Sequence, residues 1–152
     1  MNILQAEDAV NGREGVATIE LNGQIVELME LANMTITVEK TKTEFKAMGQ
    51  RNTQNKTTGW TGTGSANVRY ISSRWVKMLQ DYVKTGRDTY FTIVITNEDP
   101  GSRTGKQVIQ ILGCNIDSVD IAKLDVDTEI LDQDIDFTFN DFNVLQEFNS
   151  LV

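Results

Sequence analysis

The segment 16–30, VATIELNGQIVELME, constrains the fold most strongly. Its centre holds Asn22-Gly23, the dipeptide preferred in the two-residue type I′ turn of a β-hairpin. Apolar and polar residues alternate on both sides of this turn, which is the period of a strand with one buried face. Pairing across the turn gathers these apolar residues on one face: Ala17, Ile19, Leu21, Val26 and Leu28. The segment therefore predicts an antiparallel hairpin.

Further strands follow along the chain. Residues 33–45 and 66–71 alternate in the same way, and residues 89–96, TYFTIVIT, form an almost continuous apolar run, which favours a strand buried on both faces. Residues 130–144 alternate aspartates with Ile135, Phe137 and Phe139. In residues 106–119, simple alternation predicts that one face carries Val108, Gln110, Leu112, Cys114 and Ile116.

One helix is expected, over residues 72–86. Its apolar side chains recur at helical spacing and are Trp75, Met78, Leu79, Tyr82 and Val83. Ser72 or Ser73 can cap its start, and Gly86 suits the left-handed residue that ends a helix. This pattern predicts a mainly β chain, a single-domain β-barrel or sandwich of about six or seven strands with one packed α-helix.

Composition argues against catalysis. The 152 residues, taken as a single domain over 1–152, contain no histidine and one cysteine, Cys114. The usual general base and the commonest metal ligand are thus missing, so we expect no enzyme, no metal and no cofactor. The start of the chain lacks a basic region followed by an apolar core, and no run is long enough to span a membrane. We therefore expect no stable membrane association and synthesis in the cytoplasm.

A long polar stretch sets the middle of the chain apart. Residues 49–65, GQRNTQNKTTGWTGTGS, hold no acidic and no aliphatic side chain, although the chain has a formal net charge of -8. From Gln107 to the end there are ten acidic residues against one basic residue, Lys123. A stretch of this length without structure is usually functional or disordered. We expect a long polar loop or arm at about 41–65 that contacts an acidic neighbour.

Two motif readings fail. Gly62-Thr63-Gly64 leads into a strand and not a helix, and it lacks the lysine of a phosphate-binding loop. The acidic segment that starts at Asp132 lacks the glycine and glutamate of a calcium-binding EF-hand loop. Asp132, Asp134 and Asp136 instead share one face of a strand, and such a row of like charges suits water, a tube lumen or a basic partner.

Taken together, four stretches resemble the tail tube (tail core) proteins of contractile-tailed phages and of phage-like bacteriocin particles. They occur in the expected order and cover nearly the whole chain: NGREGVATIELNGQ, NKTTGWTGTGSANVRY, KMLQDYVKTGRDTYFTI and AKLDVDTEILDQDIDFTFNDFNV. The resemblance implies a β-barrel-like subunit that forms a homo-oligomer of hexameric rings stacked into a hollow tube. It also implies that the tube lies inside a contractile sheath, and that the tube either conducts DNA through its lumen or permeabilises the envelope of the target cell.

The resemblance also implies partners and a location. The partners are tail sheath, baseplate and tail terminator proteins, with DNA only as transient cargo of the lumen, and the location is a virion tail or phage-like particle. We expect a subunit interface at Lys46, Arg51, Asn55, Lys56, Thr57, Thr58 and Trp60, and a lumen face at Asp132, Asp134 and Asp136. Two alternatives remain open: a β-barrel that binds single-stranded nucleic acid, and the tube subunit of a contractile secretion system.

Overall fold

The computed structural model describes residues 3, 5–9, 12 and 15–150. In chain order, a short 3-10 helix (Ala6–Asp8) precedes β1 (Gly15–Leu21), β2 (Gln24–Glu27), β3 (Leu31–Lys46), β4 (Thr53–Arg69), α1 (Arg74–Thr85), β5 (Phe91–Glu98), β6 (Lys106–Val119), β7 (Asp132–Phe139) and β8 (Asp141–Gln146). The prediction of a mainly β fold with one α-helix is confirmed, and the described residues form eight strands in one sheet.

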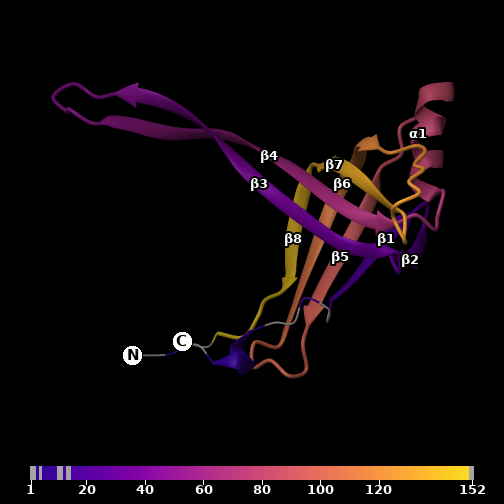
Figure 1. The fold of residues 1–152 in the computed structure, drawn as a ribbon. Coiled ribbons are helices and arrows are strands. Elements are labelled where there is room, and N and C mark those ends of the chain that lie inside the picture. The colour runs from indigo at the N-terminus through magenta and orange to yellow at the C-terminus, as the bar shows by residue number, and fades with distance from the viewer. Residues whose placement is uncertain (1–2, 4, 10–11, 13–14, 151–152) are drawn as a thin grey trace.

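All neighbouring strands of this sheet are antiparallel, in the order β2-β1-β5-β6-β7-β4-β3 (Figure 1). The long strand β6 joins the two halves of the sheet. Its first part pairs with β5 on one edge and with β8 on the other, whereas its last part pairs with β7. β7 and β8 therefore follow one another along the same edge of β6.

A single core shows that the sheet curls round. Ile19 of β1, Ile93 of β5 and Ile135 of β7 are each at most 1% exposed and belong to one cluster. Met34 and Ile36 of β3, at the far end of the strand order, pack against the same cluster. Strands from both ends of the sheet thus cover one hydrophobic interior, as in a barrel or sandwich.

The first hairpin forms as its sequence predicts. Asn22 and Gly23 both have positive φ, 53° and 81°, as a type I′ turn requires. Ile19 pairs with Val26 and Leu21 with Gln24, so the apolar side chains share the expected face.

The predicted helix is confirmed, but only half of its apolar stripe is buried. It ends at Gly86, whose φ of 75° lies in the left-handed region. Trp75 and Met78 belong to the core, and the Trp75 ring lies edge-on to Phe91 at 5.9 Å. Tyr82 and Val83 are 50% and 68% exposed, so the apolar stripe packs on the core only in its first part. Tyr82 lines a surface hollow together with Asn115, Ile116 and Asp117 of β6.

The predicted face of β6 is wrong beyond Leu112. Ile111 and Cys114 are both buried, although they are three positions apart and simple alternation would place them on opposite faces. Phe91 pairs with Cys114 and Ile93 with Ile111, so β6 has one extra residue between these pairs. Gly113 has a φ of 67° and permits this bulge, because a residue with a side chain rarely adopts that conformation. The bulge moves Cys114 to the core, where burial raises the pKa of its thiol to about 12.

The long polar stretch is a strand and not an irregular loop. Residues 53–69 form β4, which pairs with β3 along its whole length, and only residues 47–52 lie outside both strands. Threonine favours extended structure, and every second residue of β4 from Gly62 to Val68 is buried. Gly62 and Gly64 lie under the rings of Phe139 and Phe137, so the glycines of this stretch serve packing.

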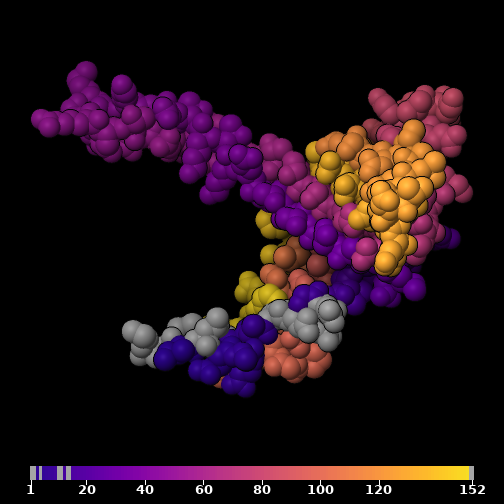
Figure 2. All heavy atoms as spheres, viewed as in Figure 1, coloured from indigo at the N-terminus to yellow at the C-terminus, as the bar shows by residue number. Residues whose placement is uncertain are grey.

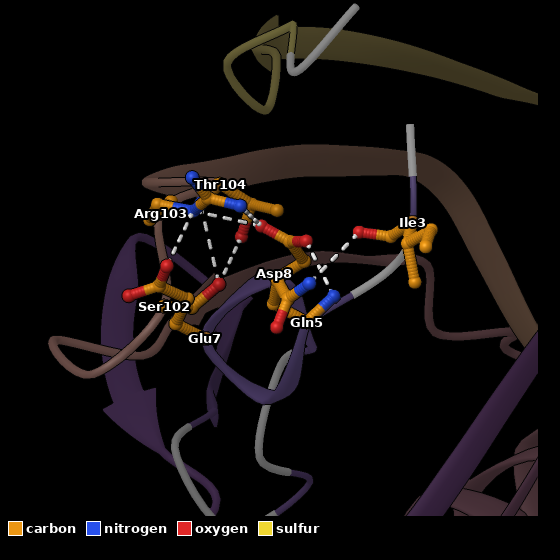
Figure 3. A network of polar contacts seen from close by, with 7 residues as sticks. All are labelled: Ile3, Gln5, Glu7, Asp8, Ser102, Arg103 and Thr104. Carbon is orange, nitrogen blue, oxygen red and sulfur yellow. Dashed lines mark hydrogen bonds and ion pairs between the residues drawn. The ribbon is translucent and has the colours of Figure 1, made fainter. Parts of the chain in front are cut away.

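A polar network fastens the N-terminal 3-10 helix to the turn between β5 and β6 (Figure 3). The side chain of Asp8 is 5% exposed, and its Oδ1 accepts hydrogen bonds from Nε of Arg103, at 2.8 Å, and from Nη2 of the same residue. The backbone N–H of Arg103 donates to the carbonyl of Glu7 at 2.7 Å. The hydrogen bond from the backbone amide of Gln5, followed by those from Arg103, lowers the pKa of Asp8.

We expect this contact to open in acid. Folding lowers the pKa of Asp8, so the ionised carboxylate stabilises the folded state. This contribution is complete above the pKa of the unfolded chain, about 3.9, and is lost as the pH falls through the lower pKa of the folded state. Arg103→Ala should remove it at every pH. Hydrogen exchange would report the opening of this contact as a loss of protection of the backbone amide at position 103. The loss should occur in acid for the wild type and already at neutral pH for the variant. Arg87→Ala is the matched control, and equal protection in both variants would contradict the assignment.

Candidate assembly surfaces

The distal part of the β3–β4 hairpin leaves the body of the molecule (Figure 1). β4 pairs with β7 from Arg69 to Gly62 and with β3 alone beyond Gly62. We call residues 39–61 the arm. Each of its strands runs for roughly 25 Å at the usual rise per residue. No residue of the arm is buried, and β4 pairs with β3 alone beyond Gly62, so within one subunit the arm has little packing outside its own two strands except at its base.

The predicted interface residues all lie in the arm. Lys46 ends β3, Arg51 lies in the connection, and the others belong to β4: Asn55, Lys56, Thr57, Thr58 and Trp60. Thr58 is an extra residue in β4, because Thr41 pairs with Gly59 while Lys42 pairs with Thr57. Its hydroxyl donates to the carbonyl of Thr41 at 3.2 Å. The arm carries five basic and two acidic side chains, so it is positively charged.

Trp60 stands where the arm joins the body. Its ring centroid lies 6.1 Å from that of Phe139 and 6.5 Å from that of Phe142. The indole is nonetheless 44% exposed. Trp60 thus fixes the base of the arm within its own subunit and still exposes part of its apolar surface.

A second surface is the outward face of the sheet formed by β3, β4 and β7, which we call the polar face. Its side chains form three rows across paired strands, and these rows are Asn33–Asn67–Asp134, Thr35–Ser65–Asp136 and Thr37–Thr63–Thr138. Hydroxyls, amides and carboxylates make up the rows, and none of these nine side chains is basic. On the other face of the same strands lie core residues such as Ala66, Ile135 and Phe137.

Hydrogen bonds hold the carboxylates of the polar face in place. The amide nitrogen of Asn67 donates to Asp134 at 2.9 Å and to Asp132 at 3.2 Å. Ser118 and Asp136 are joined by a hydrogen bond of 3.1 Å, donated by the serine hydroxyl. The Lys123 ammonium, 2.7 Å from Asp132, holds the pKa of that carboxyl below its usual range, and Asn67 adds to the effect. The three aspartates therefore share one face of β7, as alternation predicts.

Sequence reasoning missed several residues of these surfaces. Lys40 belongs to the arm but precedes the expected range of 41–65, and Lys42 lies within that range but was not among the expected interface residues. The hydroxyls of Thr35, Thr63 and Ser65 join the aspartates only because β4 lies between β3 and β7. That strand order depends on contacts between residues far apart in the sequence, which local patterns do not encode.

Neither surface has the arrangement of a catalytic or metal site. Among the described residues, no group of three or more cysteine, aspartate or glutamate side chains is placed to hold a metal ion. In the same part of the chain, no helix is long and apolar enough to cross a membrane. What the two surfaces offer is a projecting hairpin and a flat, hydrated sheet face, both suited to contacts over a large area.

Comparisons with known proteins agree with this geometry. A family model described as phage tail tube protein matches residues 2–146. Two proteins of Bacillus subtilis (strain 168) are similar over nearly their whole length. The uncharacterized protein YqbM is 39% identical over 147 residues, which are 97% of each chain. The phage-like element PBSX protein XkdM is 38% identical over 146 residues, which are 96% of this chain and 97% of XkdM.

A solved structure shares the fold at low sequence identity. It is a chain of the sheath-tube complex of an extracellular contractile injection system (PVC) in the extended state, with a TM-score of 0.71 at 7% identity, covering 93% of this chain and 94% of that one. At this identity the likeness concerns the fold alone. The family model and the two bacterial relatives carry the assignment further: the chain belongs to the phage tail tube protein family, as a structural subunit of the tube.

Proposed function

We propose that the subunit assembles into hexameric rings that stack into a hollow tube, with the arm at the contacts between subunits and the polar face toward the lumen. The observation that carries this proposal is the arm. A two-stranded hairpin is marginally stable in water by itself, and its unpaired edges invite association. An arm that packs on its own subunit only at its base, through Trp60, is best explained by a partner in another copy.

The interface that we propose comprises Lys46, Arg51, Asn55, Lys56, Thr57, Thr58 and Trp60. Their hydroxyl, amide and cationic groups can pair with an acidic surface, and the chain outside the arm is strongly acidic. Head-to-tail contacts that repeat without closing produce a filament, as a stack of rings requires.

The polar face suits a lumen through which DNA passes. Asp134 and Asp136 would repel phosphates, and no basic side chain in the three rows would hold them. Asp132 lies on the same face, but Lys123 and Arg69 beside it offset its charge. The rows of hydroxyl and amide groups keep water on the surface and offer no apolar patch on which cargo would stick.

The role that we propose is non-enzymatic and needs no cofactor. The tube would contact sheath, baseplate and terminator proteins, with DNA only as transient cargo, and would be assembled in the bacterial cytoplasm as part of a virion tail or phage-like particle. The alternative of a nucleic-acid-binding module has weaker support, because Trp60 packs on Phe139 and Phe142 and the nearby sheet face is acidic.

Negative-stain electron microscopy of the purified chain tests this function. With increasing protein concentration we expect hollow tubes of uniform width to appear above a threshold, because a stack of rings grows only when its ends can add subunits. Analytical ultracentrifugation at the same concentrations should show a loss of monomer. A chain that stays monomeric up to its solubility limit would contradict the proposal.

A further inference from the structure

One end of the hydrophobic interior is uncovered where the arm leaves the body. Phe142 and Val144 of β8 pair with Ile111 and Ile109, which lie in the core or pack against it, so both side chains are on the core side of the sheet. They are nevertheless 40% and 46% exposed. Together with Trp60 they form an apolar surface that we call the open end.

The arm places positive charge beside the open end. Lys40 pairs directly with Trp60. Lys42 and Lys46 lie two and six residues further along β3, so by alternation they share the face of Lys40. Glu44 shares that face, which still has an excess of lysines. The arm and β8 diverge from their junction and leave a hollow between them (Figures 1 and 2). Apolar residues thus line the junction, and lysines line one wall.

The chain carries a segment with the complementary pattern, the 120–131 loop. Leu124 and Val126 are 97% and 100% exposed, which is unusual for two apolar side chains so close together. Asp125, Asp127 and Glu129 alternate with or follow them. The side chain of Asp125 accepts hydrogen bonds from the Asp127 amide at 3.0 Å and the Thr128 hydroxyl at 2.6 Å. These two hydrogen bonds form a local turn at residues 125–128 of the loop.

A subunit does not bring its own loop to its own open end. The loop, in orange, bulges from the side of the body opposite to the arm (Figure 2). Another exposed apolar surface, at Tyr82 and Val83 of α1, is a poorer match, because Lys84 and Arg87 offset the charges of Asp81 and Asp88 and leave no negative excess to face the lysines of the arm.

We propose that the 120–131 loop of one copy inserts into the open end of another copy. Leu124 and Val126 contact Trp60, Phe142 and Val144, and the acidic side chains of the loop face the lysines of the arm. The contact is heterologous, so each copy both offers a loop and receives one. This inference rests on the proposed function, because it names the surface that the arm and the open end recognise during assembly.

Reciprocal charge reversal tests the pairing. Lys40→Glu with Lys42→Glu should raise the critical concentration for tube assembly at least about tenfold, because like charges then face each other. Asp125→Lys with Asp127→Lys should do the same. The chain with all four substitutions should assemble at close to the wild-type concentration. Lys77→Glu with Lys84→Glu, on the exposed surface of α1, is the control with the same charge change and should assemble normally.

The outcomes distinguish a failure of the loop-to-open-end pairing from a failure of the proposed function. If the wild type forms tubes and each double variant does so at the same concentration, or if the fourfold variant is no better than the double variants, this pairing is wrong while the proposed function stands. If the wild type forms no tubes, the proposed function fails and the inference with it. Far-UV circular dichroism and thermal unfolding of each variant check that a loss of assembly is not a loss of folding.

Cross-linking between separate copies gives a second readout. Lys42→Cys and Val126→Cys chains, mixed under assembly conditions with oxidised glutathione, should form a disulfide-linked dimer, and native Cys114 is 0% exposed and should stay reduced. Lys42→Cys mixed with Val83→Cys is the control. Equal dimer yields from the two mixtures, or none from the first, would overturn the proposed contact.

Discussion

A chain in which residues 43–56 are replaced by Asn-Gly should remain folded but form no tubes. This change joins Lys42 to Thr57, a cross-strand pair, through a two-residue turn. It removes no buried residue, so the free energy of unfolding should change by no more than about 0.5 kcal/mol. Assembly should fail because the projecting part of the arm, with Lys46, Arg51 and Lys56, is gone. Size-exclusion chromatography, thermal unfolding and electron microscopy measure the three properties.

Mixing this shortened chain with the wild type provides a sharper control. In a head-to-tail assembly the shortened chain can still accept a neighbour's arm but cannot offer its own, so it should end growing tubes. A small fraction of shortened chain should then reduce the mean tube length. Tubes of normal length and width from the shortened chain alone would show that the arm is not an assembly surface.

Gly64→Ala should strongly destabilise the subunit. A Cβ at this position would lie 2.3 Å from Cζ of Phe137, a core ring that is 2% exposed. The ring is packed in the core, so the overpacking should cost about 1–3 kcal/mol of unfolding free energy. For a chain of this size, each kcal/mol lowers the Tm by about 2–4 °C. Urea and thermal denaturation provide the measurement.

Gly59→Ala is the matched control for this substitution. Gly59 lies in the same strand, but an added Cβ there would meet nothing within 4 Å. Its unfolding free energy should change by no more than about 0.5 kcal/mol. Adding Phe137→Leu to Gly64→Ala should recover part of the lost stability by making room for the methyl group. Equal stability of the two alanine variants would disprove the close packing of glycine against phenylalanine.

The features that sequence alone predicts are those with a local cause. Asn22-Gly23 specifies its turn and, through alternation, the faces of β1 and β2, and Gly86 ends α1 where expected. The aspartates of β7 share a face for the same reason. Each of these results needs only a few consecutive residues and one side-chain period.

Features that depend on distant residues were not predictable in this way. Gly113 looks like any other glycine until β5 and β6 are paired, and the extra residue at this bulge reverses the faces of the residues that follow, as far as the next register shift between Ile116 and Ser118. The strand character of residues 53–61 depends on β3 alone, because their own pattern is not apolar. Likewise, Glu30 is 5% exposed and lies 2.9 Å from Nη1 of Arg74, an ion pair that spans 44 positions of sequence. No local sequence pattern around Glu30 or Arg74 predicts this ion pair.

The shared strand β6 has a mechanical consequence. Its backbone hydrogen bonds to β5, β7 and β8 lie across the strand axis along most of its length. A load applied along β6 is therefore a shear that strains many of these bonds at once, whereas a load that peels off an edge strand breaks them one after another. Strand β6, at the centre of the sheet, is thus the element best placed to resist a force along its own length without losing its hydrogen bonds one by one.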